Sequence, residues 1–238
     1  MQEVKQENTI LIDIETTGLQ PTESKIFTIG YTLLTNTRPD IIVLIDEDEE
    51  RLVRHFIQII DAANITRIVG YNINFDTRFI YAKCLRYRIP CKRIVDATEI
   101  DIMTILQRVR AKYTSSLNQL GKLNEWSHYL LGMEKTDDTL EILKAWGKGD
   151  FEKCYKYNYF DVLLEYKLYQ LILYSIGEVE EVKEYSEEKT HIASEMEGFN
   201  IKKVICPFCK ASNIIGDKQT KTLCAICGEE FKTQAKYF

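Results

Sequence analysis

The sequence predicts an α/β fold, with a mixed β-sheet flanked by helices and a small cysteine-rich domain after it. Strand-like and helix-like stretches alternate through the first half of the chain, and the second half is helical in pattern to about residue 176. Four of the seven cysteines then form two C-x-x-C pairs near the end. Alternating strands and helices are typical of a sheet covered by helices. The expected boundaries are 1–177 for the α/β domain, 178–198 for a charged helix or linker, and 199–238 for the small domain.

Apolar runs predict the strands of the sheet, and apolar residues at helical spacing predict the helices. Five strands are expected, at residues 9–14, 25–34, 41–45, 67–71 and 94–95. The first helix follows the acidic residues 46–50, which suit a helix N-terminus, and carries Leu52, Phe56 and Ile60 on one face. A second helix stops before Pro90. Four more helices are expected, at residues 99–109, 115–131, 138–146 and 150–176.

The composition is that of an ordinary soluble globular protein, with 45% hydrophobic and 28% charged residues in 238. The chain begins with a polar segment of mixed charge, which argues against a signal peptide. The best candidate for a membrane span, residues 168–176, is too short and contains tyrosines. We therefore expect a cytoplasmic protein that does not associate with membranes.

The net charge of −5 is unevenly distributed along the chain. From residue 200 onward seven lysines face three acidic residues, a net charge of +4, so the preceding residues carry −9. The cysteine-rich domain is therefore a basic module attached to an acidic body, which favours contact with phosphates. Ordinary scatter of charged residues is the alternative explanation.

The most informative motif follows the first expected strand, where Asp13 and Glu15 flank Ile14. Side chains alternate along a strand, so both carboxylates project from one face. Two neighbouring carboxylates repel each other and are costly to remove from water, and a bound divalent cation relieves both costs. The alternative is a strand that ends in a polar turn at residues 16–18.

Two further acidic elements occur later in the chain. Asn72 and Asp76 lie where an expected strand passes into a helix, a place where polar side chains can face a cleft. Asp76 is alternatively a helix cap. Tyr157 and Asp161 are four residues apart on a long expected helix and therefore share one face. Three apolar residues follow Asp161, so its carboxylate needs a partner, whereas aromatic packing alone would explain the tyrosines of this helix.

Together the three acidic elements resemble the exonuclease motifs of the DEDD superfamily, tyrosine subgroup. Asp-x-Glu, Asn-x-x-x-Asp and Tyr-x-x-x-Asp occur here in the order and separation of that family. The sequence around them is similar to the proofreading exonuclease domain of family B DNA polymerases and its stand-alone relatives, over residues 8–175. The histidine subgroup would place a histidine five residues before Asp161, where this chain has Lys156. Polymerase motifs are not found in the sequence, so any proofreading role would act in trans.

The resemblance implies an RNase H-like fold and 3′→5′ removal of nucleotides by two Mg²⁺ or Mn²⁺ ions. Asp13, Glu15 and Asp161 would hold the catalytic ion, and Asp13 with Asp76, partly through water, would hold the second. Ligand sets made of carboxylate oxygens suit these ions rather than zinc. By the same resemblance, Tyr157 would orient the attacking water.

The resemblance also assigns the contacts to the substrate, which is expected to be the 3′ end of single-stranded DNA or RNA. Thr16 and the turn toward Leu19 would contact the terminal nucleotide, Gly18 would allow a close backbone approach, and Asn72 would steady the site. Two alternatives stay open. One is an RNase H-like endonuclease or resolvase, which shares the fold and the acidic cluster, and the other is a non-catalytic nucleic-acid-binding adaptor.

The cysteine-rich domain resembles a zinc ribbon. Fourteen residues separate its two C-x-x-C pairs, which are formed by Cys206, Cys209, Cys224 and Cys227. Four thiolates at this spacing suit one structural Zn²⁺, which would supply much of the folding energy of so small a domain. Its lysines would grip the phosphates of a nucleic acid, or the domain would dock a protein partner.

Overall fold

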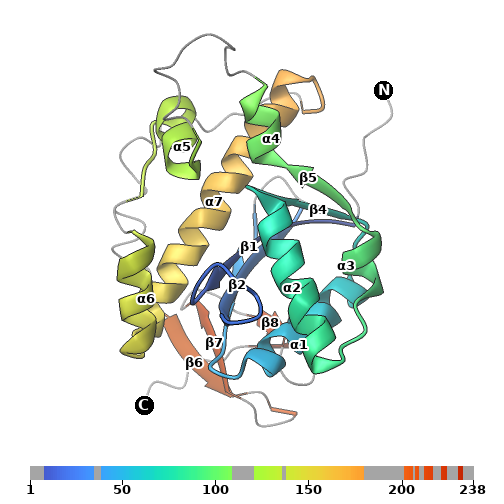
Figure 1. Cartoon of the computed structure of the whole chain (residues 1–238), viewed down its shortest axis with the longest axis vertical. Coiled ribbons are helices and arrows are strands. Elements are labelled where there is room, and N and C mark those ends of the chain that lie inside the picture. Colours follow the sequence, from blue (N-terminus) through green and yellow to red (C-terminus); the bar gives the residue numbers. More distant parts are fainter. Residues whose placement is uncertain are drawn as a thin grey trace.

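A five-stranded mixed sheet runs through the main body of the protein, and helices cover both of its faces (Figure 1). The structure is a computed structural model of the whole chain, and it describes residues 8–34, 39–108, 121–135, 138–179, 201–205, 207–208, 212–216, 221–223 and 230–232. The expected α/β architecture with a mixed sheet is confirmed.

The central strand of the sheet is β1 (Thr9–Thr16), and the order across the sheet is β3-β2-β1-β4-β5. β2 (Ile26–Leu33) pairs antiparallel with β1, and β3 (Ile42–Ile45) pairs antiparallel with β2. β4 (Arg67–Gly70) runs parallel to β1, and β5 (Thr98–Asp101) runs parallel to β4. The strand that carries Asp13 and Glu15 is thus paired with β2 along nearly its whole length and with β4 at its start, which makes it a rigid base for a site.

One face of the sheet is covered by α1 (Glu49–Ala62), α2 (Ile73–Tyr87) and α3 (Lys92–Asp96) (Figure 1). Asp48 caps α1 by accepting a hydrogen bond from the backbone N–H of Arg51, so this helix begins within the acidic segment as expected. Alternate residues of β1 and the apolar stripes of α1 and α2 form the first core.

The other face is covered by α4 (Ile102–Gln107), α5 (Leu123–Leu131) and the long helix α7 (Phe151–Ser175). These helices pack on the remaining residues of β1 and β4 to form the second core. A smaller cluster joins α6 (Thr139–Gly147) to the first turn of α7 and to β2. The acidic motifs therefore come from opposite faces, because α2 lies on one side of β1 and α7 on the other.

The prediction of a fifth strand at residues 94–95 is wrong. Residues 94–95 lie in α3, where Ile94 is buried in the first core. The fifth strand is β5, at one edge of the sheet, whose Thr-Glu-Ile-Asp sequence lacks an apolar run because its first two residues are exposed. The expected helix 99–109 accordingly begins only at Ile102, with the carboxylate of Asp101 as its N-cap.

Other expected boundaries fall partly outside the described residues. The expected helix 115–131 is described from Leu123, where α5 begins after residues 121–122. Residues 109–120 and most of the expected linker 178–198 lie outside the described part of the chain. Their secondary structure remains a prediction.

Gly30 on β2 lets α7 lie directly on the sheet. A Cβ atom at this position would stand 2.5 Å from Oδ1 of Asn158 and 2.6 Å from Cγ2 of Val162, both on α7. Such contacts are too short for any larger residue, so glycine is needed for the close approach. Gly30 also pairs with Asp13 across the sheet. The helix therefore approaches the sheet closely beside the point where β1 carries its first carboxylate.

A buried ion pair fastens the turn that follows β1. The Lys83 side chain on α2 is fully buried, and its Nζ atom lies 3.1 Å from Oε1 of Glu49 and donates a hydrogen bond to the carbonyl oxygen of Ser24. Oε1 of Glu49 also accepts a hydrogen bond from the backbone N–H of Ile26, at 2.7 Å. The turn between β1 and β2 is thus anchored from behind by α1 and α2.

Near the end of the chain the structure describes two antiparallel hairpins. β6 (Ile201–Ile205) pairs with β7 (Ser212–Gly216), and β8 (Lys221–Leu223) pairs with β9 (Glu230–Lys232). β7 lies beside β3, the edge strand of the main sheet. The four cysteines of the expected zinc site lie outside the described residues, so the zinc ribbon remains a prediction. Among the described residues, helices long and apolar enough to cross a membrane are absent.

Candidate metal centre

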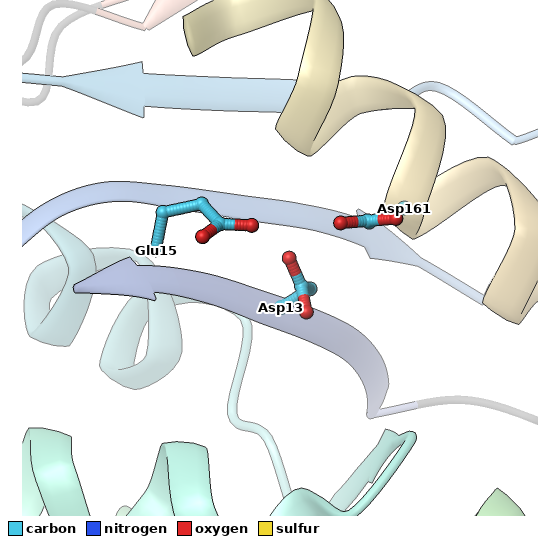
Figure 2. Close-up of side chains that lie close together, drawn as sticks. All are labelled: Asp13, Glu15 and Asp161. Atoms are coloured by element: carbon cyan, nitrogen blue, oxygen red, sulfur yellow. The ribbon is translucent and has the colours of Figure 1, made fainter. Parts of the chain in front are cut away.

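Three carboxylates from β1 and α7 meet at one point. One oxygen from each of Asp13, Glu15 and Asp161 lies within 4.8 Å of the others. Figure 2 shows the carboxyl groups of the two strand residues turned toward Asp161 on the helix. Alternation along β1 places Asp13 and Glu15 on the face that α7 covers, while Ile14 enters the opposite core. The structure thus brings together three of the four expected metal ligands in one cluster.

The fourth expected ligand, Asp76, approaches β1 from α2. The pairing of β1 with β4 ends at Leu11, so the backbone N–H of Ile14 is not used by a neighbouring strand on that side. Oδ1 of Asp76 accepts a hydrogen bond from this N–H at 2.9 Å, and the side chain is only 4% exposed. Asp76 is therefore fixed between the positions of Asp13 and Glu15, rather than serving as the cap of its own helix, which begins at Ile73.

Asn158 supports the cluster from α7 and was missed from the sequence. Its side chain is fully buried, and its Nδ2 atom donates hydrogen bonds to the carboxylate of Asp13 and, at 3.2 Å, to the carbonyl oxygen of Asp13. The residue lies three positions before Asp161, so both side chains emerge from the same face of the helix. That spacing, together with an amide among apolar neighbours, was the available sequence signal.

Lys135 is the cation of the site, and it too was missed. Its Nζ atom forms an ion pair with Oδ1 of Asp161, lies 3.3 Å from the hydroxyl oxygen of Tyr157, and stands 4.4 Å from the centre of that tyrosine ring. Lys135 lies between α5 and α6, where its backbone N–H donates a hydrogen bond to Oδ1 of Asn124 at 2.6 Å. A lysine in a loop has no periodicity, so the sequence offered no signal for it.

Tyr157 lies one helical turn before Asp161 on α7, as the spacing in the sequence predicts. It is half-buried, and burial, followed by repulsion from Asp161, raises the pKa of its hydroxyl. The hydroxyl is therefore protonated at neutral pH. A neutral phenol beside an ammonium group can orient a water molecule but is not a base.

Glu165 adds a further carboxylate that the sequence analysis did not single out. It follows Asp161 by one turn of α7 and is 1% exposed. Burial, followed by repulsion from Asp76 and Asp161, raises the pKa of Glu165 well above its usual range. The signal available in the sequence was an acidic residue at helical spacing from Asp161 within an apolar stretch.

The electrostatics of the cluster favour a bound cation. Burial raises the pKa of Glu15 and of Asp76 to about 8, with repulsion from neighbouring carboxylates adding to it. Burial and then the charges of Glu165 and Asp161 raise the pKa of Asp13 in the same direction. Among the described residues, Lys135 lowers the pKa of Glu15 and Asp161, and the carboxylates near it outnumber this one cation. Carboxylate oxygens in this arrangement fit a hard divalent cation such as Mg²⁺ or Mn²⁺.

The residues expected to contact the substrate lie around the β1–β2 turn and at the start of α2. Thr16 is buried and its hydroxyl donates a hydrogen bond to the carbonyl oxygen of Gly18 at 2.7 Å. A Cβ atom at Gly18 would stand 2.6 Å from Oγ of Ser24, so the turn closes tightly there. Leu19 is 79% exposed. Asn72 is exposed in a left-handed conformation, with φ of 59°, at the junction between β4 and α2.

Comparison with known proteins agrees with this architecture. The profile of the RNase_H superfamily matches residues 10–173, which include every carboxylate of the cluster. An uncharacterized protein of Methanocaldococcus jannaschii is 32% identical over 146 residues, covering 60% of this chain and 78% of the relative.

A solved structure extends the comparison to the fold. The family B DNA polymerase of the hyperthermophilic archaeon Pyrobaculum calidifontis is similar over 69% of this chain, with a TM-score of 0.57 and 16% sequence identity. This chain corresponds to 24% of the length of that polymerase. At this level of identity the similarity concerns the fold.

Proposed function

The chain belongs to the RNase_H superfamily, and on that premise we propose that it is a metal-dependent 3′→5′ exonuclease acting on single-stranded DNA or RNA. The observation that carries the proposal is the meeting of Asp13, Glu15 and Asp161 within 4.8 Å of one another. The similarity of fold to a family B DNA polymerase agrees with the resemblance of the three motifs to the proofreading exonuclease of such enzymes.

In this proposal Asp13, Glu15 and Asp161 hold the first divalent cation, and Asp13 and Asp76 hold the second. Two such ions would supply an activated water and would stabilise the leaving oxygen of the phosphodiester. The protein's own contribution is positional. Asn158 fixes the carboxylate of Asp13, and the backbone N–H of Ile14 fixes that of Asp76.

Tyr157 and Lys135 lie beside Asp161 in the proposed site. The protonated hydroxyl of Tyr157 orients the attacking water through a hydrogen bond. Lys135 holds this hydroxyl and the carboxylate of Asp161, so it positions both groups at once. Its positive charge also offsets the charge of an approaching phosphate.

The terminal nucleotide is proposed to lie against the β1–β2 turn. Leu19 presents an exposed apolar side chain there, which suits contact with a base or a sugar. Thr16 and Gly18 hold the turn in shape through their hydrogen bond, and Asn72 would steady the site from the start of α2. This turn is anchored by the buried pair of Lys83 and Glu49, which keeps it fixed relative to the carboxylates.

Degradation of labelled strands tests the proposed activity. Single-stranded DNA and RNA labelled at the 5′ end should shorten stepwise from the 3′ end in Mg²⁺ or Mn²⁺, and a chelator should stop the reaction. Asp13→Asn should abolish the shortening. Asp96→Asn, at an exposed carboxylate of α3 paired with Lys92, is the matched control and should retain full activity. Full activity of Asp13→Asn would contradict the site assignment.

Two further substrates separate the exonuclease from its alternatives. A phosphorothioate linkage at the 3′ end should block an exonuclease, whereas an endonuclease or resolvase would still cut interior bonds. A strand that is bound but remains intact in both ions would identify a non-catalytic adaptor.

For the cysteine-rich domain we propose one structural Zn²⁺ held by Cys206, Cys209, Cys224 and Cys227. Its lysines would contact the phosphates of the substrate strand, and a protein partner is the alternative. Zinc analysis of the purified full chain should give one equivalent, which Cys206→Ser should lower. Binding of single strands at rising salt separates the two roles, because phosphate contacts weaken steeply with salt. Unchanged binding in Cys206→Ser would favour the protein partner.

A further inference from the structure

Glu165 is a buried carboxylate that the exonuclease motifs do not use. It is 1% exposed and lies among apolar residues of α7, between Leu164 and Leu168, both of which are fully buried. Burial of an acidic side chain is costly unless a partner compensates for it. The groups around Glu165 therefore indicate what compensates for the cost of burying its carboxylate.

One side of the Glu165 carboxylate has a partner, and the other does not. The backbone N–H of Tyr71, directly after β4, donates a hydrogen bond to the carboxylate. The Oε2 atom is buried and has no hydrogen-bond partner among the described residues. The helix is thus tied to the end of β4 through one part of this side chain, while a second oxygen is left without a donor.

The hydrogen bond to Tyr71 places the Glu165 carboxylate beside the acidic cluster. Val69 of β4 pairs with Leu11 of β1, and Tyr71 and Asp13 each follow two residues after this pair. Among the charges that act on Asp13, that of Glu165 has the largest effect, ahead of Asp161 and Asp76. Among the charges that act on Glu165, the largest effects come from Asp76 and then Asp161. The contact with Tyr71 and these charges agree in placing Glu165 near Asp13, the carboxylate that the two cations would share.

Glu165 would give the second cation a further protein ligand. Asp13 is shared with the first cation, and one oxygen of Asp76 already accepts the N–H of Ile14. Mg²⁺ and Mn²⁺ take about six oxygen ligands, some of them water or substrate phosphate, and a nearby carboxylate with an unused oxygen can fill one of these positions. We propose that Glu165 is a fifth carboxylate of the metal centre and a direct ligand of the second cation, an assignment that rests on the proposed function.

Mn²⁺ titration of the full chain by calorimetry, without nucleic acid, tests this assignment. The wild-type protein should bind two ions at the carboxylates, because Mn²⁺ prefers oxygen to the thiolates of the cysteine-rich domain. Glu165→Gln keeps the size of the side chain and its acceptor for Tyr71, but removes the charge. This substitution should lower the affinity for the second Mn²⁺ ion by about tenfold or more and leave the affinity for the first ion unchanged.

A matched control and a second measurement exclude a merely structural role. Glu99→Gln changes an exposed carboxylate that also acts on Asp76 but accepts a hydrogen bond from Thr77, and it should leave both affinities unchanged. The rise in unfolding temperature caused by Mn²⁺ should shrink in Glu165→Gln only. A role limited to holding Tyr71 would leave that rise intact.

The outcomes separate this proposal from the proposed function. Two ions of unchanged affinity in Glu165→Gln would overturn the assignment of Glu165 while leaving the exonuclease proposal in place. A wild-type protein that binds no Mn²⁺ would overturn both. Selective loss of the second ion, with strand degradation reduced in proportion at low Mn²⁺ and restored at high Mn²⁺, is the expected result.

Discussion

The side-chain amide of Asn158 on α7 donates a hydrogen bond to the carboxylate of Asp13 on β1, across 145 positions of sequence. The contact depends on Gly30, because any larger residue there would collide with Asn158. The helix that delivers Asp161 therefore also fixes the orientation of Asp13. Two of the carboxylates that would hold a cation are positioned by one helix–sheet contact.

Asn158→Leu should weaken cation binding without unfolding the protein. Leucine has a similar volume but no amide, so Asp13 loses the group that orients it. Loss of such a supporting partner lowers metal affinity by about 10–100-fold, while the free energy of unfolding changes by roughly 1–3 kcal/mol. Calorimetric titration with Mn²⁺ and urea denaturation measure the two effects. Asn74→Leu, at an exposed position of α2, is the control; equal affinities in both variants would contradict the role of Asn158.

Without cations, the folded protein should lose stability as the pH rises from about 4 to about 8. Burial raises the pKa of Glu15 and of Asp76 to about 8, whereas the same groups titrate near 4 in an unfolded chain. Between these values the folded state binds more protons than the unfolded state, so the free energy of unfolding falls with rising pH. Thermal unfolding in a chelating buffer measures the trend.

Mn²⁺ should act against this trend, because it binds the deprotonated carboxylates. The stabilisation by Mn²⁺ should therefore be largest at about pH 8, the upper end of this pH range. Asp76→Asn removes one of the two groups and should make the dependence on pH shallower. Stability that rises with pH in the chelating buffer would show that these carboxylates are ionised in the folded protein throughout.

Lys135→Met should slow strand degradation and move its pH dependence upward. The charge of Lys135 lowers the pKa of Asp161, against the effect of burial, so its removal raises the pH at which Asp161 becomes available to a cation. Loss of the contact with Tyr157 should reduce the rate by about 10–100-fold. Rates of strand degradation measured across pH in Mn²⁺ give both the loss of rate and the shift of the pH profile. Lys144→Met, exposed on α6, should behave as wild type, and an unshifted profile in Lys135→Met would contradict this role.

The parts of the site that the sequence predicted are those with local regularity. Asp13 and Glu15 share a face because strands alternate, and Tyr157 and Asp161 share one because helices repeat. Lys135 has neither property, since it reaches the site from a loop. Lys135 joins the cluster through tertiary packing. The spacing of residues along the chain does not reveal such packing.

The same distinction explains the fold. Apolar runs marked β1 to β4, each of which has a strand on both sides or a covered face. β5 was missed because an edge strand can be polar and still pair. Glu165 and Asn158 were missed for the opposite reason: each lies within a helix whose other residues already had an explanation in core packing.

Lys83→Met should destabilise the protein far more than loss of a surface ion pair. The ammonium group of Lys83 is buried against Glu49 and the carbonyl oxygen of Ser24. Its removal leaves Glu49 as a buried charge without its cation, and breaking a buried pair in this way costs about 3–5 kcal/mol. Urea denaturation measures the change. Lys92→Ala, which breaks an exposed pair with Asp96, is the control and should have no measurable effect.

The double variant Lys83→Met, Glu49→Gln decides whether the lost stability comes from the unpaired charge. Glutamine keeps an oxygen that can accept the N–H of Ile26 but has no charge to leave unpaired, so the double variant should recover much of the loss. The Ser24 carbonyl oxygen stays without its donor in both variants, and the β1–β2 turn should loosen equally. If that turn holds the terminal nucleotide, both variants should therefore bind single strands more weakly, even where stability has been restored. Wild-type binding in the double variant would mean that the turn does not need this anchor.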